Sequence, residues 1–393
     1  MTSPAPDPFA PAKLGPLTLR NRVIKAATFE GVTREHVVSD RLIEFHRRVA
    51  AGGVGMTTVA YCAVSPEGCG TPNEIVLTRD TVPGLRNIAD AVHAEGAAIS
   101  AQIGHAGAVA AAARIKGVGP SPIFSPLAMK RTRAATLEDI GRITREFADA
   151  ARIVADGGFD AVVIDLGHGY LVSEFLSPKL NKRTDADGGS REKRARFARE
   201  VARAVRDAVG PNLAVLAKLN MSDGVAGGFW VDESVEVARL LEADGALDAI
   251  ELTGGSSLEN PMYLFRGEAP IHEMAAAFPQ PIKGMFKLFG NRFLPSYPFE
   301  EAYFLPYARQ FRAALSMPLV LLGGITRRAT IEQAMREGFE FVAMGRTLLR
   351  EPDLVARMAK DEAGESLCVH CNKCMATIYR GTHCVLVPPA ERA

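Results

Sequence analysis

The chain has 393 residues, of which 47% are apolar and 23% are charged, and its formal net charge is +1. This composition is typical of a globular protein in water, and so small a net charge gives no electrostatic reason to expect nucleic acid or an acidic membrane as a partner. No apolar run approaches the roughly 20 residues of a membrane span, and the Pro-rich start lacks the regions of a secretion signal. We therefore expect a cytoplasmic protein that acts on a small molecule, and we leave the formation of a homo-oligomer open.

Short β-branched runs alternate with longer amphipathic stretches along the chain. The short runs are continuously apolar, as in strands buried on both faces of a parallel sheet. The predicted strands are Arg22–Ala27, Val54–Val64, Ala97–Ile103, Phe159–Leu166, Leu213–Leu219, Leu247–Leu252, Leu319–Leu322 and Phe341–Met344. The predicted helices between them include Asp139–Asp156, Arg191–Val209, Asp232–Ala243 and Thr330–Glu337.

Eight strand–helix units without a break in composition predict an α/β protein with a single (β/α)8 barrel. A doubly wound sheet is the alternative, but the first strand is not followed by GxGxxG. We assign the barrel to residues 1–360 and a Cys-rich tail, not an independent domain, to residues 361–393. Long loops follow the third, fourth and sixth strands, at the end where a barrel places its active site. The longest, 253–298, is rich in Phe, Tyr and Met, and forms either a small core of its own or a lid over a bulky apolar substrate.

Polar side chains and glycines stand where the predicted strands end. They are Ala27, Thr28, Ala60, Gln102, Asp165, His168, Tyr170, Lys218, Thr253, Gly323, Gly324, Gly345 and Arg346. The last four follow strands seven and eight, the usual phosphate-binding corner of a barrel, where Gly admits close backbone approach and Arg supplies charge. This pattern favours a phosphorylated ligand.

Two further side chains bear on the chemistry of that ligand. Lys218, in LAVLAKLN, is either a salt-bridged structural lysine or a contact to a negative charge on the ligand. Gln102, in AISAQIGHAG, carries an amide that both donates and accepts hydrogen bonds, which suits a flat heterocycle with mixed edges.

In its motifs and their order the chain resembles the old yellow enzyme family of flavin-dependent oxidoreductases. The motifs are LGPLTLRNRVIKAAT, AQIGHAG, GHGYLVSEFLSPKLNKRTDADGGS, RARFARE, AKLN, LLGGI and AMGRTLLREPDL, which lie between about Leu14 and Met358. The resemblance implies FMN bound noncovalently, with its phosphate on the glycines and arginine of the last two strands. It also implies that Ala60 and Gln102 touch the flavin ring, that Lys218 lies near its N1/O2 edge, and that Ala27 and Thr28 lie at the cofactor. The position that usually carries Thr or Cys near flavin O4 falls on Phe29, one residue after Thr28.

The resemblance further implies that NAD(P)H reduces the flavin, which then passes hydride to an activated alkene, an apolar substrate with an electron-withdrawing group. Two donors hold the substrate oxygen, and a tyrosine protonates the α-carbon. His168 matches the second donor and Tyr170 the acid, but Asp165 stands where the first donor belongs. Because an ionised carboxylate accepts hydrogen bonds, Asp165 is either protonated, turned away, orienting His168, or capping the loop.

The C-terminal segment concentrates four of the six cysteines. Cys368, Cys371, Cys374 and Cys384 have the spacing C-x2-C-x2-C-x9-C. Thiolates at such spacing bind zinc or an iron–sulfur cluster, and longer members of the family carry a four-cysteine [4Fe–4S] site after the barrel. The alternative is a thiol-rich tail that packs near the barrel without metal.

Three functions remain open from the sequence. The first is an FMN-dependent reductase of activated C=C bonds that consumes NAD(P)H. The second is an FMN-dependent dehydrogenase or demethylase, in which Asp165 or His168 serves as the base. The third is a barrel that binds a phosphorylated ligand without flavin.

Overall fold

A computed structural model describes residues 5–110, 117–125, 130–276, 280–378, 380–389 and 392. Its centre is a closed barrel of eight parallel strands, in which the first strand pairs with both the second and the last. In chain order the barrel strands are β3 (Val23–Lys25), β4 (Met56–Ala63), β6 (Ala98–Gly104), β11 (Ala161–Leu166), β12 (Ala214–Asn220), β13 (Ala249–Thr253), β14 (Leu319–Leu321) and β15 (Phe341–Met344). The prediction of a (β/α)8 barrel is confirmed, and each predicted strand overlaps an observed one.

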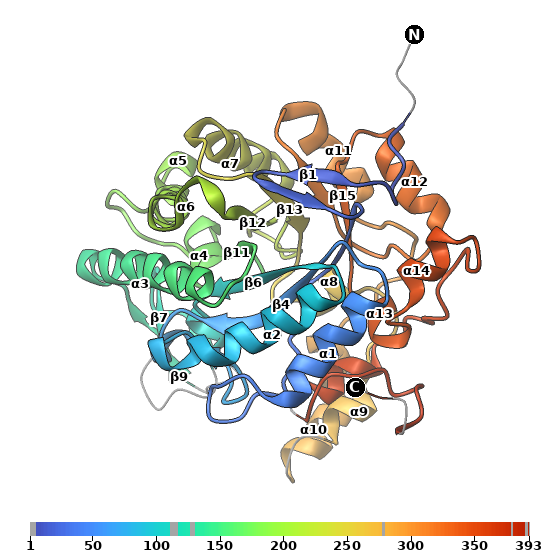
Figure 1. Cartoon of the computed structure of the whole chain (residues 1–393). Helices are drawn as coiled ribbons and strands as arrows, with labels where there is room; N and C mark the ends of the chain where they lie inside the picture. Colours follow the sequence, from blue (N-terminus) through green and yellow to red (C-terminus); the bar gives the residue numbers. More distant parts are fainter. Residues whose placement is uncertain are drawn as a thin grey trace.

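Helices surround the barrel in chain order (Figure 1). They include α1 (Asp40–Ala51), α2 (Val82–Ala94), α3 (Leu137–Asp156), α6 (Arg196–Val209), α7 (Val231–Asp244), α11 (Leu305–Ala314), α12 (Arg328–Arg336), α13 (Arg346–Arg350) and α14 (Leu354–Ala359). Their apolar faces form a continuous core with the outer faces of the strands, because both surfaces must leave water. The stretch predicted as one helix over Arg191–Val209 is two, since α5 (Arg191–Arg194) ends at Ala195 before α6 begins.

An N-terminal hairpin closes one end of the barrel. The strands β1 (Ala12–Leu14) and β2 (Leu17–Leu19) pair antiparallel around Gly15, and their apolar side chains belong to the core inside the barrel, with Ile24 and Met56. This hairpin was not predicted, because three-residue strands give too short an alternating pattern.

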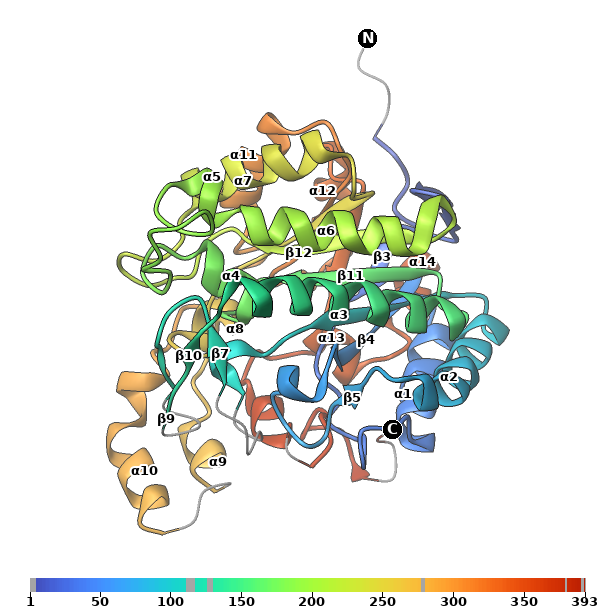
Figure 2. The same ribbon diagram turned by 90° about the vertical axis from the view of Figure 1, so that its left-hand side faces the viewer.

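The long loops gather at the opposite end, where α4 (Leu171–Leu176) and α8 (Pro261–Phe265) lie (Figure 2). The short strands of these loops are β5 (Ile75–Val76), β7 (Val118–Gly119), β8 (Phe124–Ser125), β9 (Lys130–Arg131) and β10 (Arg133–Ala134). Their short 3-10 turns are η1 (Pro66–Gly68), η2 (Arg79–Thr81) and η3 (Gly107–Val109), and η4 (Gly210–Asn212) lies elsewhere, between α6 and β12. Among the described residues, no helix has the length and apolar character to cross a bilayer.

The loop after β13 contains α8, α9 (Ile271–Ala275) and α10 (Ile282–Phe293). It has a small apolar core of its own, made by Met262, Ile271 and Leu294, and Met375 of the C-terminal tail completes it. Met375 lies on η5 (Lys373–Thr377), so the tail and this loop are packed as one surface feature. The interpretation of this loop as a segment with its own core therefore agrees with the structure.

Candidate active site

The polar side chains at the ends of β6 and β11 meet around one carboxylate. Asp165 accepts a hydrogen bond from Gln102 Nε2 at 3.0 Å and from the Gly167 backbone N–H at 2.9 Å. Nδ1 of His168 lies 2.9 Å from Asp165 Oδ1. Asp165 is only 1% exposed, so this carboxylate lies against His168 and is not turned away from it.

Strand register places a row of charges beside Asp165. Asp165 of β11 is aligned with Lys218 of β12, and Lys218 is aligned with Glu251 of β13. The Lys218 ammonium lies 2.9 Å from Glu251 Oε1, and both side chains are buried. Lys218 is thus salt-bridged, as one of the two sequence interpretations states, and Glu251 is a partner that was not predicted.

His168 has a left-handed backbone, with φ of +64°, a conformation that a non-glycine residue adopts only when its surroundings hold it there. Its backbone N–H donates to Asn220 Oδ1 at 3.1 Å, and its Nε2 lies 3.2 Å from the Thr253 hydroxyl. The next residue, Gly169, must be glycine, because its φ is +72° and a Cβ there would lie 2.5 Å from Ser256 Oγ. The Gly-His-Gly sequence therefore serves to hold the imidazole over the end of the barrel.

Tyr170 lies next to this pair. Its ring packs edge-on against Tyr61 at 5.2 Å and against His168 at 5.9 Å between ring centres. Burial raises the pKa of Tyr170, the charges of Asp165 and Glu74 raise it further, and a hydrogen bond with Ser257 opposes them. The phenol is therefore protonated at neutral pH.

The end of the first strand is organised by a buried ion pair. Glu30, 1% exposed, lies 2.5 Å from the Lys25 ammonium, and it accepts hydrogen bonds from the Thr28 hydroxyl at 3.0 Å and from the Ala60 backbone N–H at 3.0 Å. Although burial raises the pKa of Glu30, Lys25 and His46 outweigh it and hold that pKa well below its usual range. The Thr28 hydroxyl, whose role the sequence left unsettled, thus faces Glu30.

The arginine of the predicted phosphate corner points away from it. Gly323 and Gly324 have left-handed backbones, with φ of +107° and +71°. Thr28 lies beside Gly345, since its Cγ2 would be 3.4 Å from a Cβ atom at that glycine. Arg346 donates to the Arg266 carbonyl at 3.2 Å and to the Asn372 side chain. Its guanidinium is therefore directed to the loop after β13 and to the C-terminal tail.

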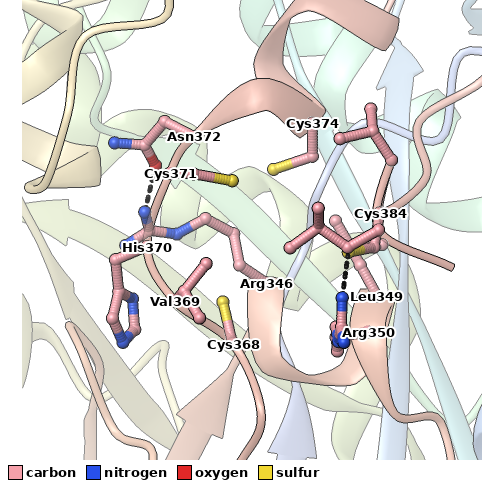
Figure 3. Close-up of a pocket in the computed structure, with 12 residues that line it drawn as sticks. Arg346, Leu349, Arg350, Cys368, Val369, His370, Cys371, Asn372, Cys374 and Cys384 are labelled. Atoms are coloured by element: carbon pink, nitrogen blue, oxygen red, sulfur yellow. Dashed lines mark hydrogen bonds between the residues drawn. The ribbon is translucent and has the colours of Figure 1, made fainter.

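The four C-terminal cysteines line one small cavity, into which Arg346 and Arg350 also project. Figure 3 shows the sulfurs of Cys371 and Cys374 turned toward each other, and the Cys368 sulfur across the Arg346 side chain from them. Burial raises the pKa of Cys374 to about 11; Arg346 lowers it, and the other three thiols raise it. Within the described part of the chain, no set of three or more His, Cys, Asp or Glu side chains has the geometry to hold a metal ion.

Several residues of the site were not predicted from the sequence: Lys25, Glu30, Asn220 and Glu251. Lys25 and Glu251 did leave a signal, since each interrupts an otherwise apolar strand, and a charged side chain in a buried strand requires a partner. Glu30 left none, because it follows the strand in an irregular loop.

The site fits FMN. Gln102 Oε1 is buried without a hydrogen-bond partner among the described residues, which leaves an acceptor for a donor on the ring of a bound heterocycle. Lys218 supplies a cation at the same end of the barrel, and the glycines after β14 and β15 lie where barrels bind phosphate. Together, barrel and site define a class: flavin-dependent oxidoreductases built on a (β/α)8 barrel.

Comparison with known proteins identifies the family. Residues 7–251 match the model of the NADH:flavin oxidoreductase / NADH oxidase family. A 4,4'-dithiodibutanoate disulfide reductase of Rhodococcus erythropolis is 56% identical over 387 residues, which cover 98% of this chain and 96% of that protein. The chain therefore belongs to this family, the old yellow enzyme family that its motifs indicated, and is an NAD(P)H:flavin oxidoreductase.

Other relatives are longer. A multifunctional alkene reductase/demethylase of Caballeronia cordobensis is 31% identical over 400 residues, covering 100% of this chain and 54% of that protein. The structure of 2-naphthoyl-CoA reductase in complex with 2-naphthoyl-CoA superposes with a TM-score of 0.81 at 26% identity, covering 97% of this chain and 57% of that one. The chain thus spans little more than half of these relatives and nearly all of the Rhodococcus protein.

Proposed function

We propose that the protein is an FMN-dependent reductase of small organic disulfides that consumes NAD(P)H. The observation that carries the proposal is the arrangement at Asp165, where a carboxylate occupies the position of an oxygen-binding donor and accepts hydrogen bonds from Gln102 and His168. A site with a carboxylate there is poorly suited to an oxyanion, because both carry negative charge. A disulfide has no carbonyl or nitro oxygen that a pair of donors must hold, and its thiolate product is a much weaker base than an enolate. The similarity to the Rhodococcus disulfide reductase over nearly the full length supports this choice.

The cofactor would be held by residues at the strand ends. Ala27, Thr28, Ala60, Gln102 and Lys218 would lie at the flavin ring, and Gly323, Gly324 and Gly345 at its phosphate. Arg346 would reach the phosphate only by leaving Asn372 and the Arg266 carbonyl. When bound, FMN supplies the means to accept hydride from NAD(P)H and to deliver it to the acceptor. In the overall reaction the S–S bond breaks, one sulfur receives the hydride as S–H, and the other leaves as a thiolate that takes up a proton, so NAD(P)H, one proton and one disulfide give NAD(P)+ and two thiols.

Tyr170 and His168 would stabilise the leaving sulfur. A thiol has an ordinary pKa of about 8.5, far below the raised pKa of Tyr170. The phenol would therefore donate a hydrogen bond to the thiolate and not transfer its proton, which the thiolate takes from solvent. Asp165 would hold His168 in one orientation, with Nδ1–H toward the carboxylate. Because a neutral imidazole has a single N–H, His168 would donate to the sulfur through Nε2 only as the imidazolium.

Reduction of activated C=C bonds is the second candidate, and Tyr170 favours it. An enolate-type carbon is a much stronger base than a thiolate, so a protonated phenol beside the acceptor suits the protonation of that carbon. The similarity to the Caballeronia alkene reductase/demethylase supports this candidate. In this reaction His168 would be the residue that holds the substrate oxygen, and Asp165 would contact the other side of its imidazole ring.

Turnover assays separate the candidates. Purified holoprotein should be yellow, bleach anaerobically with NADH or NADPH, and release two thiols from 4,4'-dithiodibutanoate for each nicotinamide oxidised. Turnover of cyclohexenone or maleimide without turnover of the disulfide would replace the first candidate by the second. Bleaching by an N-methylated amine without nicotinamide would replace both by a dehydrogenase.

We further propose that Cys368, Cys371, Cys374 and Cys384 hold a [4Fe–4S] cluster. Support comes from their convergence on one cavity and from their C-x2-C-x2-C-x9-C spacing, because closely spaced thiolates are the usual ligands of such clusters. The alternative, a metal-free thiol tail, predicts neither iron nor zinc in anaerobically purified protein. Elemental analysis with a visible spectrum of the flavin-free protein decides between them.

A further inference from the structure

The loop after β13, which we call the lid segment, contains an arginine, Arg266, that packs against three tyrosine rings. The guanidinium carbon of Arg266 lies 4.9 Å from the ring centre of Tyr263, 4.8 Å from that of Tyr297 and 5.6 Å from that of Tyr303. Its Nε is buried without a hydrogen-bond partner, and among the described residues no carboxylate forms an ion pair with it. Three aromatic faces thus hold the cation, and within the described part of the chain its Nε–H is left without an acceptor.

Arg266 lies at the phosphate corner. Its carbonyl oxygen accepts hydrogen bonds from Arg346 at 3.2 Å and from Asn372 at 2.9 Å. The ring of Tyr303, on which Arg266 packs, is pressed against Gly324, since a Cβ at Gly324 would lie 2.6 Å from that ring. One aromatic ring therefore separates the guanidinium from a glycine predicted to bind phosphate.

The same segment also reaches His168, which lies against Asp165. Ser257, nine residues before Arg266, donates its backbone N–H to the His168 carbonyl at 2.7 Å. Between the two lies α8, whose five residues rise about 8 Å. Only the short helix α8 therefore separates Arg266 from the part of the segment that contacts His168.

Three features of Arg266 oppose folding and suit binding. Its φ is +44°, which is strained for a side chain other than glycine. Its buried Nε has no hydrogen-bond partner among the described residues, and none of the described carboxylates forms an ion pair with its half-buried guanidinium. A guanidinium fork held flat by aromatic rings matches two oxygens of a carboxylate or phosphate. We propose that Arg266 binds the terminal anionic group of a ligand of this site.

Two ligands carry such a group. One is FMN, through its 5'-phosphate, for which Arg266 would be a second cation beside Arg346. The other is an organic disulfide with a terminal carboxylate, and this source rests on the proposed function. The test below measures the binding of each ligand and not its turnover. Its result can therefore be interpreted whether or not the protein reduces disulfides.

The test compares Arg266→Met, which removes the charge and keeps an apolar stem, with Arg266→Lys and with a control, Arg292→Met, an exposed cation on α10 of the same lid. The Kd of FMN and of riboflavin is measured on apoprotein by flavin fluorescence. The Kd of 4,4'-dithiodibutanoate and of its dimethyl ester is measured on oxidised holoprotein from the change in the flavin spectrum. Circular dichroism verifies that each variant is folded.

We expect Arg266→Met to weaken one anionic ligand about tenfold or more, which corresponds to one charge-assisted contact, while its neutral counterpart and the control variant change less than about twofold. A loss for FMN but not riboflavin assigns the phosphate, and a loss for the disulfide dianion but not its ester assigns the carboxylate. Arg266→Lys should restore part of the loss. Unchanged binding of both anions, or equal losses for the charged and neutral ligands, would overturn the proposal and leave Arg266 as an anchor of the lid.

Discussion

The end of β11 and the C-terminal tail both bring reactive side chains to the loop-rich end of the barrel, but they are built differently. Asp165 and Lys218 stand on neighbouring strands in fixed register, and each buried charge has a partner within hydrogen-bond distance. The four cysteines stand on a segment with little regular structure, which Asn372 ties to the lid through the Arg266 and Glu268 carbonyls.

The two regions therefore differ in what fixes the position of a side chain. A side chain at a strand end is placed by the barrel itself, so its environment persists when a loop changes. A side chain on the tail is placed by contacts with the lid and with the loop after β3, where the Thr382 backbone N–H donates to the Glu30 carbonyl at 2.7 Å. We expect changes at β11 to alter chemistry with little loss of structure, and changes in the tail to alter what the tail binds.

The largest expected effect is that of Tyr170→Phe on alkene reduction. Loss of the proton donor should slow flavin reoxidation by cyclohexenone by about 100-fold or more, whereas reoxidation by 4,4'-dithiodibutanoate should slow by about tenfold or less, because only a hydrogen bond is lost. Stopped-flow absorbance measures both, and reduction by NAD(P)H serves as the internal control. Equal losses with both acceptors would contradict the two roles assigned to Tyr170.

Asp165→Asn also tests the difference between disulfide and alkene reduction. The variant removes the negative charge beside His168 and places an amide donor where an oxyanion would form. Disulfide reduction should fall by about tenfold or more, and the ratio of alkene to disulfide turnover should rise. The visible spectrum and FMN content should stay unchanged, since the residue is placed by the barrel; a fall in this ratio would show that the carboxylate has another role.

In the tail, Cys374→Ser should remove iron and leave flavin chemistry in place. With a [4Fe–4S] cluster, the iron content should drop from about four atoms per chain to near zero, while NAD(P)H-dependent flavin reduction changes less than about twofold. Cys62→Ser, at a buried thiol on β4 outside the tail, is the matched control. Iron that is retained in Cys374→Ser would show that this residue is not a ligand.

The smallest expected effect concerns Glu174, a buried acid just after the Gly-His-Gly-Tyr motif. Burial raises the pKa of Glu174 to about 8, and its only described partner is the Ala108 backbone N–H at 2.6 Å. Because the folded-state pKa lies above the unfolded value near 4.3, the stability that this group contributes is full below about pH 4.3 and is lost as the pH rises through about 8.

Glu174→Gln removes that titration. The Tm of the variant relative to wild type should therefore rise by a few degrees between pH 5.5 and pH 9. Differential scanning calorimetry at the two pH values measures this difference in Tm. The control is Asp149→Asn, on the exposed face of α3, for which the difference in Tm should not change with pH. A difference in Tm that is constant with pH would contradict the shifted pKa.

The features that could be predicted from the sequence are those that periodicity and strand register determine. The eight strands leave apolar runs, and Gln102, Asp165 and His168 meet because they stand at the ends of adjacent strands. The hairpin over Ala12–Leu19 and the break of the helix at Ala195 were missed, because three-residue strands and single-residue breaks carry too little pattern.

The remaining differences come from side-chain direction, which spacing does not encode. Arg346 follows the last strand as predicted, but its guanidinium is drawn to Asn372 and the Arg266 carbonyl. Arg266 itself lies in a loop whose path depends on the small core around Met262 and Met375. No local signal in the sequence marks either contact, since the partners are distant in the chain.

The most direct test of the central claim is a competition at the oxidative half-reaction. Holoprotein reduced anaerobically with one equivalent of NADH or NADPH is mixed with 4,4'-dithiodibutanoate or with cyclohexenone at equal concentration, and the return of the flavin absorbance is followed. A site whose carboxylate excludes an oxyanion predicts faster reoxidation by the disulfide. Rapid reoxidation by cyclohexenone, with no reaction of the disulfide, would contradict that account of Asp165.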